Sequence, residues 1–269
     1  MKMKKESASL SDYVYSLQSR GHYWFDRTKA IQSTGLSPAS FAVAVSRLVK
    51  KKAIQRVRGD FFIIIPVQYV LVGTLPATWF MDPFMRSLDL PYYVSLLSAA
   101  GIHGASHQQV MVFQVMTNKI MRPIKMGNLK INFYFRKVIN PDCYLPVKTE
   151  TGQINVARPE MTLCDCFRYQ EAAGHLNNIA TLLLELHEKI HMKKLMTYIR
   201  SGFLELTHIQ RLGYLIEQLQ IPLDTQDLYR FAQERNMQNC LLVSGLPSSE
   251  NYNEKWKIII NETVEPDDL

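Results

Sequence analysis

Cysteine is scarce in this sequence. The 269 residues include only Cys143, Cys164, Cys166 and Cys240, and their spacing is irregular. A small disulfide-bonded scaffold needs more cysteines, at regular spacing, in a shorter chain, so that class of protein is excluded. We therefore expect the four thiols to be reduced.

Long apolar runs are also missing. The longest candidates, "FFIIIPVQYVLVG" and "IATLLLEL", are shorter than the roughly 18 residues that a transmembrane helix needs. The first residues, "MKMKKESASLSDY", carry charge but lack the apolar segment of a signal peptide. With 47% hydrophobic and 20% charged residues, the composition predicts a globular, cytoplasmic protein with one large domain or two smaller ones.

The motifs of several enzyme classes are missing as well. The twelve glycines are scattered and form neither a phosphate-binding loop nor a dinucleotide-binding fingerprint, and no nucleophile elbow is present. One segment does match a catalytic pattern. "HEKIH" places His187, Glu188 and His191 at the spacing of the zinc peptidases, in which both histidines bind zinc and the glutamate is the general base. A zinc peptidase is therefore one alternative function.

The surroundings of "HEKIH" argue against a metal. A catalytic zinc site needs a third protein ligand, and downstream only Glu205 and His208 are near. The neighbouring Lys189, Lys193 and Lys194 would repel a divalent cation. We predict that the protein has no metal, no cofactor and no catalytic residue, and that it is not an enzyme.

Acidic residues are few at the front of the chain. Residues 1–60 hold 12 Lys and Arg against 4 Asp and Glu, residues 61–148 hold 8 against 3, and residues 149–269 hold 11 against 17. The strongly basic N-terminal part predicts an acidic partner, most simply nucleic acid. The basic residues between Arg86 and Lys148 fit either added DNA contact or an acidic protein, and the sequence does not decide between these.

Two short helices are predicted at the start of the chain. In "SLSDYVYSLQSRG" the apolar residues Leu10, Val14 and Leu17 follow a helical spacing. The segment "DRTKAIQSTG" predicts a second helix, because Asp26 is a suitable N-cap and Gly35 a suitable end.

A third helix and a hairpin follow. "SPASFAVAVSRLVKKK" begins with Ser37 as the N-cap and Pro38 at the first helical position. Its expected inward face comprises Phe41, Val45, Leu48 and Val49. In "AIQRVRGDFFIII" the turn residues "RGD" separate two β-rich runs. Three short helices followed by a hairpin predict a winged helix-turn-helix domain over residues 1–68.

Seven residues of this domain are expected to contact DNA. They are Ser37, Ser40, Arg47, Lys50, Lys51, Arg56 and Arg58. Small or polar residues at the front of the third helix let its backbone approach the major groove, and the cations reach base edges or phosphates. In the hairpin, Arg56 and Arg58 alternate with one valine, so both should point the same way. The alternative is a winged helix that serves as a protein-interaction adaptor without binding DNA.

A larger α+β domain is predicted over residues 69–260. We expect a helix from about Pro91 to Ala100 and strands in "QQVMVFQVMT" and "LKINFYFRKV". A helical block should begin after Pro159 and continue to about Glu234, before a last strand in "NEKWKIIINET". The acidic end, residues 261–269, should be disordered. The fold class is thus α+β, with a winged helix-turn-helix before a mixed α/β domain that ends in helices.

Two motifs of the larger domain carry a family resemblance. "RPEMTLCDC" and "RLGYLIE", together with "YYVSLLSAAGIHG" and "VMVFQVMT", resemble the AbiEi-type antitoxins in order and spacing. These are the transcriptional regulators of the abortive-infection type IV toxin–antitoxin systems. The matching residues of the first motif are Pro159, Glu160, Thr162, Leu163 and Asp165. Met161 departs from the arginine that the family often has there. The resemblance covers roughly residues 9–220.

The resemblance implies a function for each part of the chain. The winged helix would bind double-stranded DNA at inverted repeats in its own promoter and repress transcription. The second domain, AbiEi-like, would neutralise a cognate nucleotidyltransferase-like toxin, with or without direct contact. No metal, no cofactor and no membrane is implied. The resemblance also predicts that one helix ends near Glu188 and the next begins after Ile190, so that "HEKIH" would be a helix–helix junction.

Overall fold

The computed structural model describes residues 9–105 and 112–266. Contacts divide the chain into two compact units. The first comprises residues 1–93, 111–139 and 146–155, and the second comprises residues 94–110, 140–145 and 156–269. Residues 108–111 of the first predicted strand and 267–269 of the predicted tail lie outside the described residues. No helix within the described ranges is long and apolar enough to cross a membrane.

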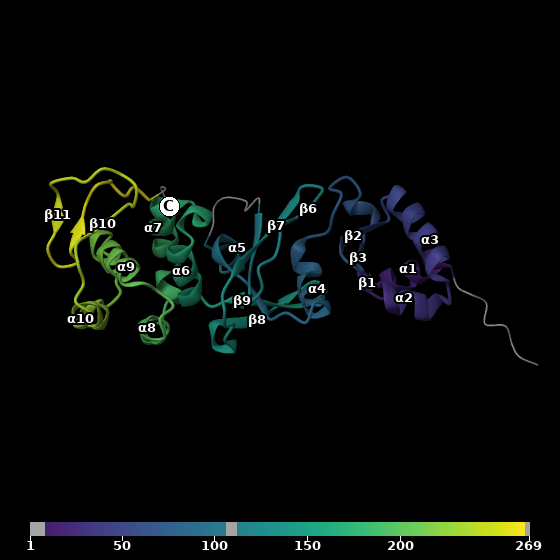
Figure 1. The fold of residues 1–269 in the computed structure, drawn as a ribbon, viewed down its shortest axis with the longest axis horizontal. Helices are drawn as coiled ribbons and strands as arrows, with labels where there is room; N and C mark the ends of the chain where they lie inside the picture. The colour runs from purple at the N-terminus through teal and green to yellow at the C-terminus, as the bar shows by residue number, and fades with distance from the viewer. Residues whose placement is uncertain (1–8, 106–111, 267–269) are drawn as a thin grey trace, which may run out of the picture. The chain divides into compact units, whose positions relative to one another are not determined.

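Three helices open the described chain (Figure 1). They are α1 (Leu10–Gln18), α2 (Arg27–Thr34) and α3 (Pro38–Lys50). The side chain of Ser9 caps α1, and the Asp26 carboxylate accepts the Lys29 amide at 2.8 Å to cap α2. Gly35 ends α2 in the left-handed conformation, with φ of 68°, which glycine adopts without a steric penalty. The two short helices and the third helix are thereby confirmed.

A three-stranded antiparallel sheet packs with these helices. It consists of β1 (Trp24–Asp26), β2 (Ile54–Arg58) and β3 (Phe61–Ile64), in the order β1-β3-β2. The predicted hairpin is confirmed, and its turn contains Gly59 with φ of 56°. The strand β1 was not predicted, because three residues are too few to show an alternating pattern.

The strand β3 is buried on both faces. Phe62 and Ile64 pack in one core with the three helices, together with Phe41. Phe61 and Ile63 face a second core within the same unit, formed with α4 (Met81–Ser87) and part of the larger sheet. Successive side chains of a strand point to opposite faces, so this one strand contributes to two apolar clusters.

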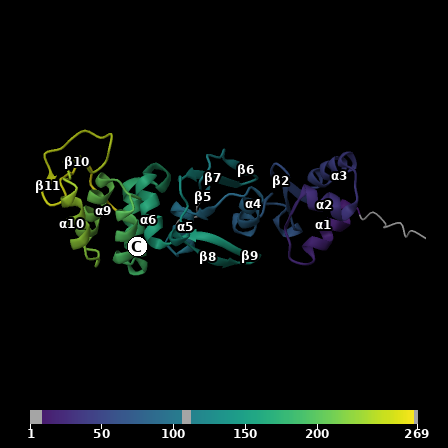
Figure 2. The ribbon, with the colours of Figure 1, turned by 60° about the horizontal axis from the view of Figure 1, so that its bottom comes forward.

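The larger sheet has six strands. They are β4 (Tyr92–Val94), β5 (Val112–Thr117), β6 (Ile124–Met126), β7 (Leu129–Phe135), β8 (Tyr144–Thr149) and β9 (Gly152–Ala157). Their order is β6-β7-β5-β4-β9-β8, with β5 parallel to β7 and β6 antiparallel to β7. Figure 2 shows these strands from another side. The strand predicted in "QQVMVFQVMT" is confirmed for its described residues, 112–117, which form β5. The strand predicted in "LKINFYFRKV" is confirmed as β7.

The helix predicted from Pro91 to Ala100 is wrong in its first half. Residues Tyr92–Val94 form β4, and the helix α5 (Leu96–Ile102) begins only after it. All three residues of β4 are buried, and a short run of tyrosine and valine suits a buried strand. Periodicity alone does not separate such a run from a buried helical segment.

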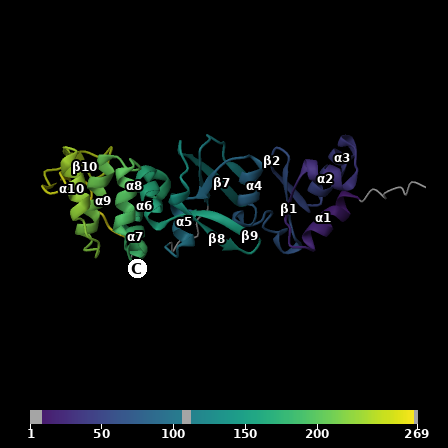
Figure 3. The ribbon, with the colours of Figure 1, turned by 90° about the horizontal axis from the view of Figure 1, so that it is seen from below.

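A helical block and a small sheet complete the second unit (Figure 3). The helices are α6 (Pro159–Arg168), α7 (His175–Leu186), α8 (Met192–Arg200), α9 (Leu206–Gln218) and α10 (Gln226–Glu234). The sheet contains β10 (Cys240–Leu241), β11 (Tyr252–Asn253) and β12 (Ile258–Ile259), in the order β10-β12-β11. Strands followed by a helical block confirm the α+β class, and β12 confirms the last predicted strand.

Helix α9 holds this small sheet in place. Gly213 lies directly against the fully buried indole of Trp256, because a Cβ added there would come within 2.2 Å of the ring. The Gln210 amide donates to the Trp256 carbonyl at 2.8 Å. The Arg211 guanidinium donates to the Leu241 carbonyl at 2.9 Å. One short stretch of α9 therefore holds both β10 and the turn before β12 through polar and packing contacts.

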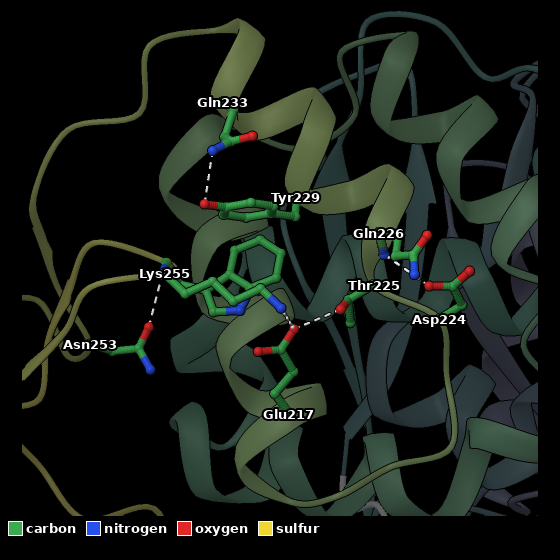
Figure 4. A network of polar contacts seen from close by, with 9 residues as sticks. Glu217, Asp224, Thr225, Gln226, Tyr229, Gln233, Asn253 and Lys255 are labelled. Atoms are coloured by element: carbon green, nitrogen blue, oxygen red, sulfur yellow. Dashed lines mark hydrogen bonds and ion pairs between the residues drawn. The ribbon is translucent and has the colours of Figure 1, made fainter.

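A polar network joins α9 to the segment before α10 and to the last sheet (Figure 4). The Glu217 carboxylate accepts hydrogen bonds from the Thr225 hydroxyl and the Lys255 ammonium, each at 2.6 Å. Burial alone would raise the pKa of Glu217, but these hydrogen bonds outweigh it and hold the pKa below its usual range. The network favours the ionised carboxylate and links these segments to α9.

Replacing Gly213 with alanine should destabilise the protein by about 1–3 kcal/mol, because the added methyl group overlaps the Trp256 ring. Alanine is intrinsically the better helix former by up to about 1 kcal/mol, so a loss of stability reports the overlap. Urea unfolding measures the change. In a Trp256→Leu background the same substitution should cost less, and an equal cost in both backgrounds would contradict this contact.

Candidate nucleic-acid interface

The N-terminal end of α3 is organised by two serines. The Ser37 hydroxyl oxygen accepts the Ser40 amide at 3.1 Å, and the Ser37 hydroxyl donates to the Ser40 hydroxyl oxygen at 2.9 Å. Pro38 occupies the first turn. Both serines are exposed, so the structure leaves them accessible while using one of them as the helix cap. Their predicted contact with DNA stays a prediction.

The C-terminal end of α3 carries the predicted cations. Arg47 and Lys50 lie in the last turn, Lys51 is the C-cap, and all three are exposed. This end of a helix has a partial negative charge, so cations stabilise it. Phe41 and Leu48 are buried as predicted. Val49 is 43% exposed, and its predicted place on the inward face is wrong.

The two hairpin arginines do not point the same way. The pairing of β2 with β3 shifts register between Arg56 and Arg58, and such a bulge re-aims the side chains that follow it. The exposed Arg56 guanidinium lies 5.1 Å from the centre of the Phe62 ring. The Arg58 guanidinium instead donates to the Arg122 carbonyl at 2.5 Å and lies over the Phe133 ring. Arg58 is therefore committed to an internal contact.

A groove of about 540 Å³ runs between α3 and β2. Its apolar lining is made by Phe41, Ala42, Val45, Val49 and Phe62. Its three cationic residues are Arg27, Lys50 and Arg56. Arg27 is not among the seven residues that the sequence predicts to contact DNA. It lies 6.0 Å from the centre of the Phe41 ring and 3.9 Å from the Asp60 carboxylate.

A larger cavity of about 750 Å³ lies elsewhere in the first unit. Trp24 and Trp79 contribute to its lining. In its lining the Arg86 guanidinium lies 2.8 Å from the Asp82 carboxylate. The Trp79 indole donates to the Glu150 carboxylate. Charges of both signs line it, so it lacks the single-sign character of an anion-binding surface.

The segment "HEKIH" is a junction between helices. Helix α7 ends at Leu186, residues His187–Lys189 form a 3₁₀ turn, Ile190 is extended, and α8 begins at Met192. The His187 ring nitrogen Nδ1 lies 2.5 Å from the Leu184 carbonyl oxygen. The predicted junction is confirmed, and the two imidazoles do not share a helical face.

The residues around this junction serve packing. The amide of His191 donates to the buried Glu160 carboxylate at 2.9 Å, which lies in the first turn of α6. Across the described ranges, no group of three or more histidine, cysteine and acidic side chains is placed to hold a metal ion. The broken helix removes the geometric basis of the zinc-peptidase hypothesis.

The comparisons with known proteins address the larger domain. Residues 93–218 match the family model described as the AbiEi antitoxin C-terminal domain. The chain contains an AbiEi-type antitoxin domain. The family resemblance seen in "RPEMTLCDC" and "RLGYLIE" is thereby confirmed, and an antitoxin role in a toxin–antitoxin system is supported. The AbiEi family is not an enzyme family. Comparison with the curated proteins gives no match.

One solved structure is similar over most of its length. The crystal structure of the RV2827C protein from Mycobacterium tuberculosis superposes with a TM-score of 0.66 at 11% sequence identity. The match covers 93% of this chain and 90% of that one. At this low identity the likeness concerns the fold alone.

The motif residues of the AbiEi domain have structural roles here. Arg158 donates to the Asp142 carbonyl at 3.0 Å, and its own carbonyl accepts the Thr162 hydroxyl. Glu160 accepts the His191 amide, as described above. The motif therefore positions α6 against the loop before β8 and against the start of α8, all within the second unit.

Replacing Glu160 with alanine should lower the free energy of unfolding by about 1–3 kcal/mol, because the His191 amide loses its acceptor. Glu160→Gln keeps an oxygen acceptor and should cost less. The matched control is Glu188→Ala at the exposed glutamate of "HEKIH", which should leave urea unfolding unchanged. Destabilisation by Glu188→Ala, or stoichiometric zinc in protein purified without chelator, would contradict the junction assignment.

Proposed function

We propose that the chain is a DNA-binding transcriptional autorepressor and antitoxin of a type IV toxin–antitoxin system. The observation that carries the DNA-binding part is the groove between α3 and β2, lined by Arg27, Lys50 and Arg56. The antitoxin part rests on the AbiEi domain at residues 93–218.

The arrangement of residues 10–64 supports a winged helix-turn-helix. In this proposal α2 and α3 form the helix-turn-helix, Gly35 and Ser37 make the tight turn between them, and the β2–β3 hairpin is the wing. The recognition helix α3 would enter the major groove while the wing contacts the backbone. The proposed DNA-binding domain comprises residues 1–68.

Electrostatics supports the same surface. Exposed cations gather at the end of α3, namely Arg47, Lys50 and Lys51, and the exposed Arg56 lies across the groove. Each phosphate neutralised by a cation releases condensed counterions, so binding should weaken steeply as salt rises. The resemblance to AbiEi antitoxins implies inverted repeats in the protein's own promoter as the target.

The antitoxin activity belongs to the second domain in this proposal. The cognate toxin is taken to be nucleotidyltransferase-like, and neutralisation does not require direct contact between the two proteins. Repression and neutralisation are then separate activities, carried by separate parts of one chain. The gene next in the operon should encode the nucleotidyltransferase-like toxin.

Replacing Lys50 and Arg56 together with alanine should weaken binding to DNA from upstream of the operon. Loss of two phosphate contacts should also flatten the slope of log K against log salt by about two. Fluorescence anisotropy over a salt series measures both quantities. Arg58→Ala should leave the slope unchanged, because the Arg58 guanidinium already binds the Arg122 carbonyl.

The control variant also removes two positive charges, but from the second unit. Lys193 and Arg200 are exposed on α8 in the second unit, and replacing both with alanine changes the net charge equally. Normal DNA affinity is expected for this control. An equal loss in control and test variants would place DNA binding outside the α3–β2 groove. Wild-type protein without affinity for upstream DNA would overturn autorepression itself.

Growth rescue measures toxin neutralisation separately from DNA binding. When the toxin gene is co-expressed from an unrelated promoter, the Lys50→Ala, Arg56→Ala variant should still restore growth, because neutralisation is assigned to the second domain. Colony counts relative to wild-type antitoxin measure this. Loss of rescue in a variant that remains folded and abundant would show that the two activities share the basic groove.

A further inference from the structure

The first nine residues of α3 lack the side chains that read bases by bidentate hydrogen bonding. Residues 38–46 read "PASFAVAVS", which includes no arginine, lysine, asparagine, glutamine or acid. Bidentate recognition of guanine uses arginine or lysine, and that of adenine uses asparagine or glutamine. The first cation of this helix, Arg47, comes only in its third turn.

Small side chains, most of them apolar, lie at the positions where such readers would be expected. Val43 is 52% exposed, and Ala39, Ala42 and Ser46 are exposed as well. Residues 39, 43 and 46 follow the spacing of one helical face. This face points away from the core side, on which Phe41 is buried. The exposed Ala39 and Val43, beside a basic groove, fit a partner that offers both negative charge and apolar contact.

Duplex DNA offers both. Its phosphates carry the charge, and the thymine 5-methyl is the apolar group that base pairs present in the major groove. We propose that α3 recognises thymine methyl groups through Ala39 and Val43, while Lys50 and Arg56 hold the flanking phosphates. This proposal rests on the DNA-binding function proposed above and specifies how that function selects its sequence.

The test compares thymine with uracil, which keeps every hydrogen-bonding group and removes only the methyl. The duplex directly upstream of the operon is prepared with thymine or with uracil throughout. Wild-type protein should bind the uracil duplex about tenfold more weakly, the size of one lost base contact of moderate strength. Fluorescence anisotropy at one fixed salt concentration gives both dissociation constants.

Variants separate methyl contact from an effect of uracil on DNA shape. Val43→Ala should shrink the thymine-to-uracil ratio of affinities, because the contacting side chain is shortened. The matched control is Val67→Ala, which makes the same change at a valine that is 86% exposed outside α3 and should leave the ratio intact. An equal ratio for wild-type and Val43→Ala proteins would overturn the proposal.

The remaining outcomes are distinct from failure of the proposed function. If the protein bound the thymine duplex in a salt-dependent way and bound the uracil duplex with the same affinity, the methyl contact would be wrong. The proposal of autorepression would be unaffected. No binding to either duplex would overturn autorepression itself. If Val43→Ala lost toxin neutralisation and kept the full thymine-to-uracil ratio, the apolar face would be a protein-binding surface and the proposal would be wrong.

Discussion

Burial of β3 on both faces is the constraint on which the first unit depends. Phe62 and Ile64 complete the core beneath the helices, and Phe61 and Ile63 complete the neighbouring core. Burying each such side chain stabilises the fold by about 1.5–3 kcal/mol, so this strand has little freedom to shift. The two cores therefore restrict the register of the β2–β3 hairpin, in which the pairing shifts between Arg56 and Arg58.

Local signals in the sequence predicted most of the N-terminal elements. Asp26, Gly35, Ser37 and Pro38 set helix boundaries through their own backbone preferences and short-range hydrogen bonds, and these need no knowledge of distant residues. The orientation of Arg58 depends instead on a carbonyl 64 residues away. Alternation along a strand predicts side-chain direction only where the register is regular, so no inspection of "RVRGD" alone could place that guanidinium.

Contacts between residues distant in the sequence also determine the lining of the groove and the role of one motif in the second unit. Arg27 reaches the groove because α2 and α3 share one core, which is a tertiary consequence of packing. In "RLGYLIE" the sequence showed a resemblance but not a role. The structure shows that Arg211 and Gly213 hold the last sheet through the Leu241 carbonyl and the Trp256 ring. A motif that identifies a domain can therefore consist of residues that stabilise the fold. Such a motif need not lie on the surface that binds a partner.

In the proposed interface, cationic side chains supply affinity and apolar side chains supply sequence specificity. Contacts from lysine and arginine to phosphates are independent of sequence and supply most of the binding free energy. Discrimination must then come from the front of α3, where apolar contacts with methyl groups are individually modest. One such helix would separate its operator from other DNA weakly. Two copies of the chain on an inverted repeat would double the discriminating free energy, since contributions from well-separated base pairs add. In this proposal, an inverted-repeat operator would thus compensate for the few base contacts that α3 can make.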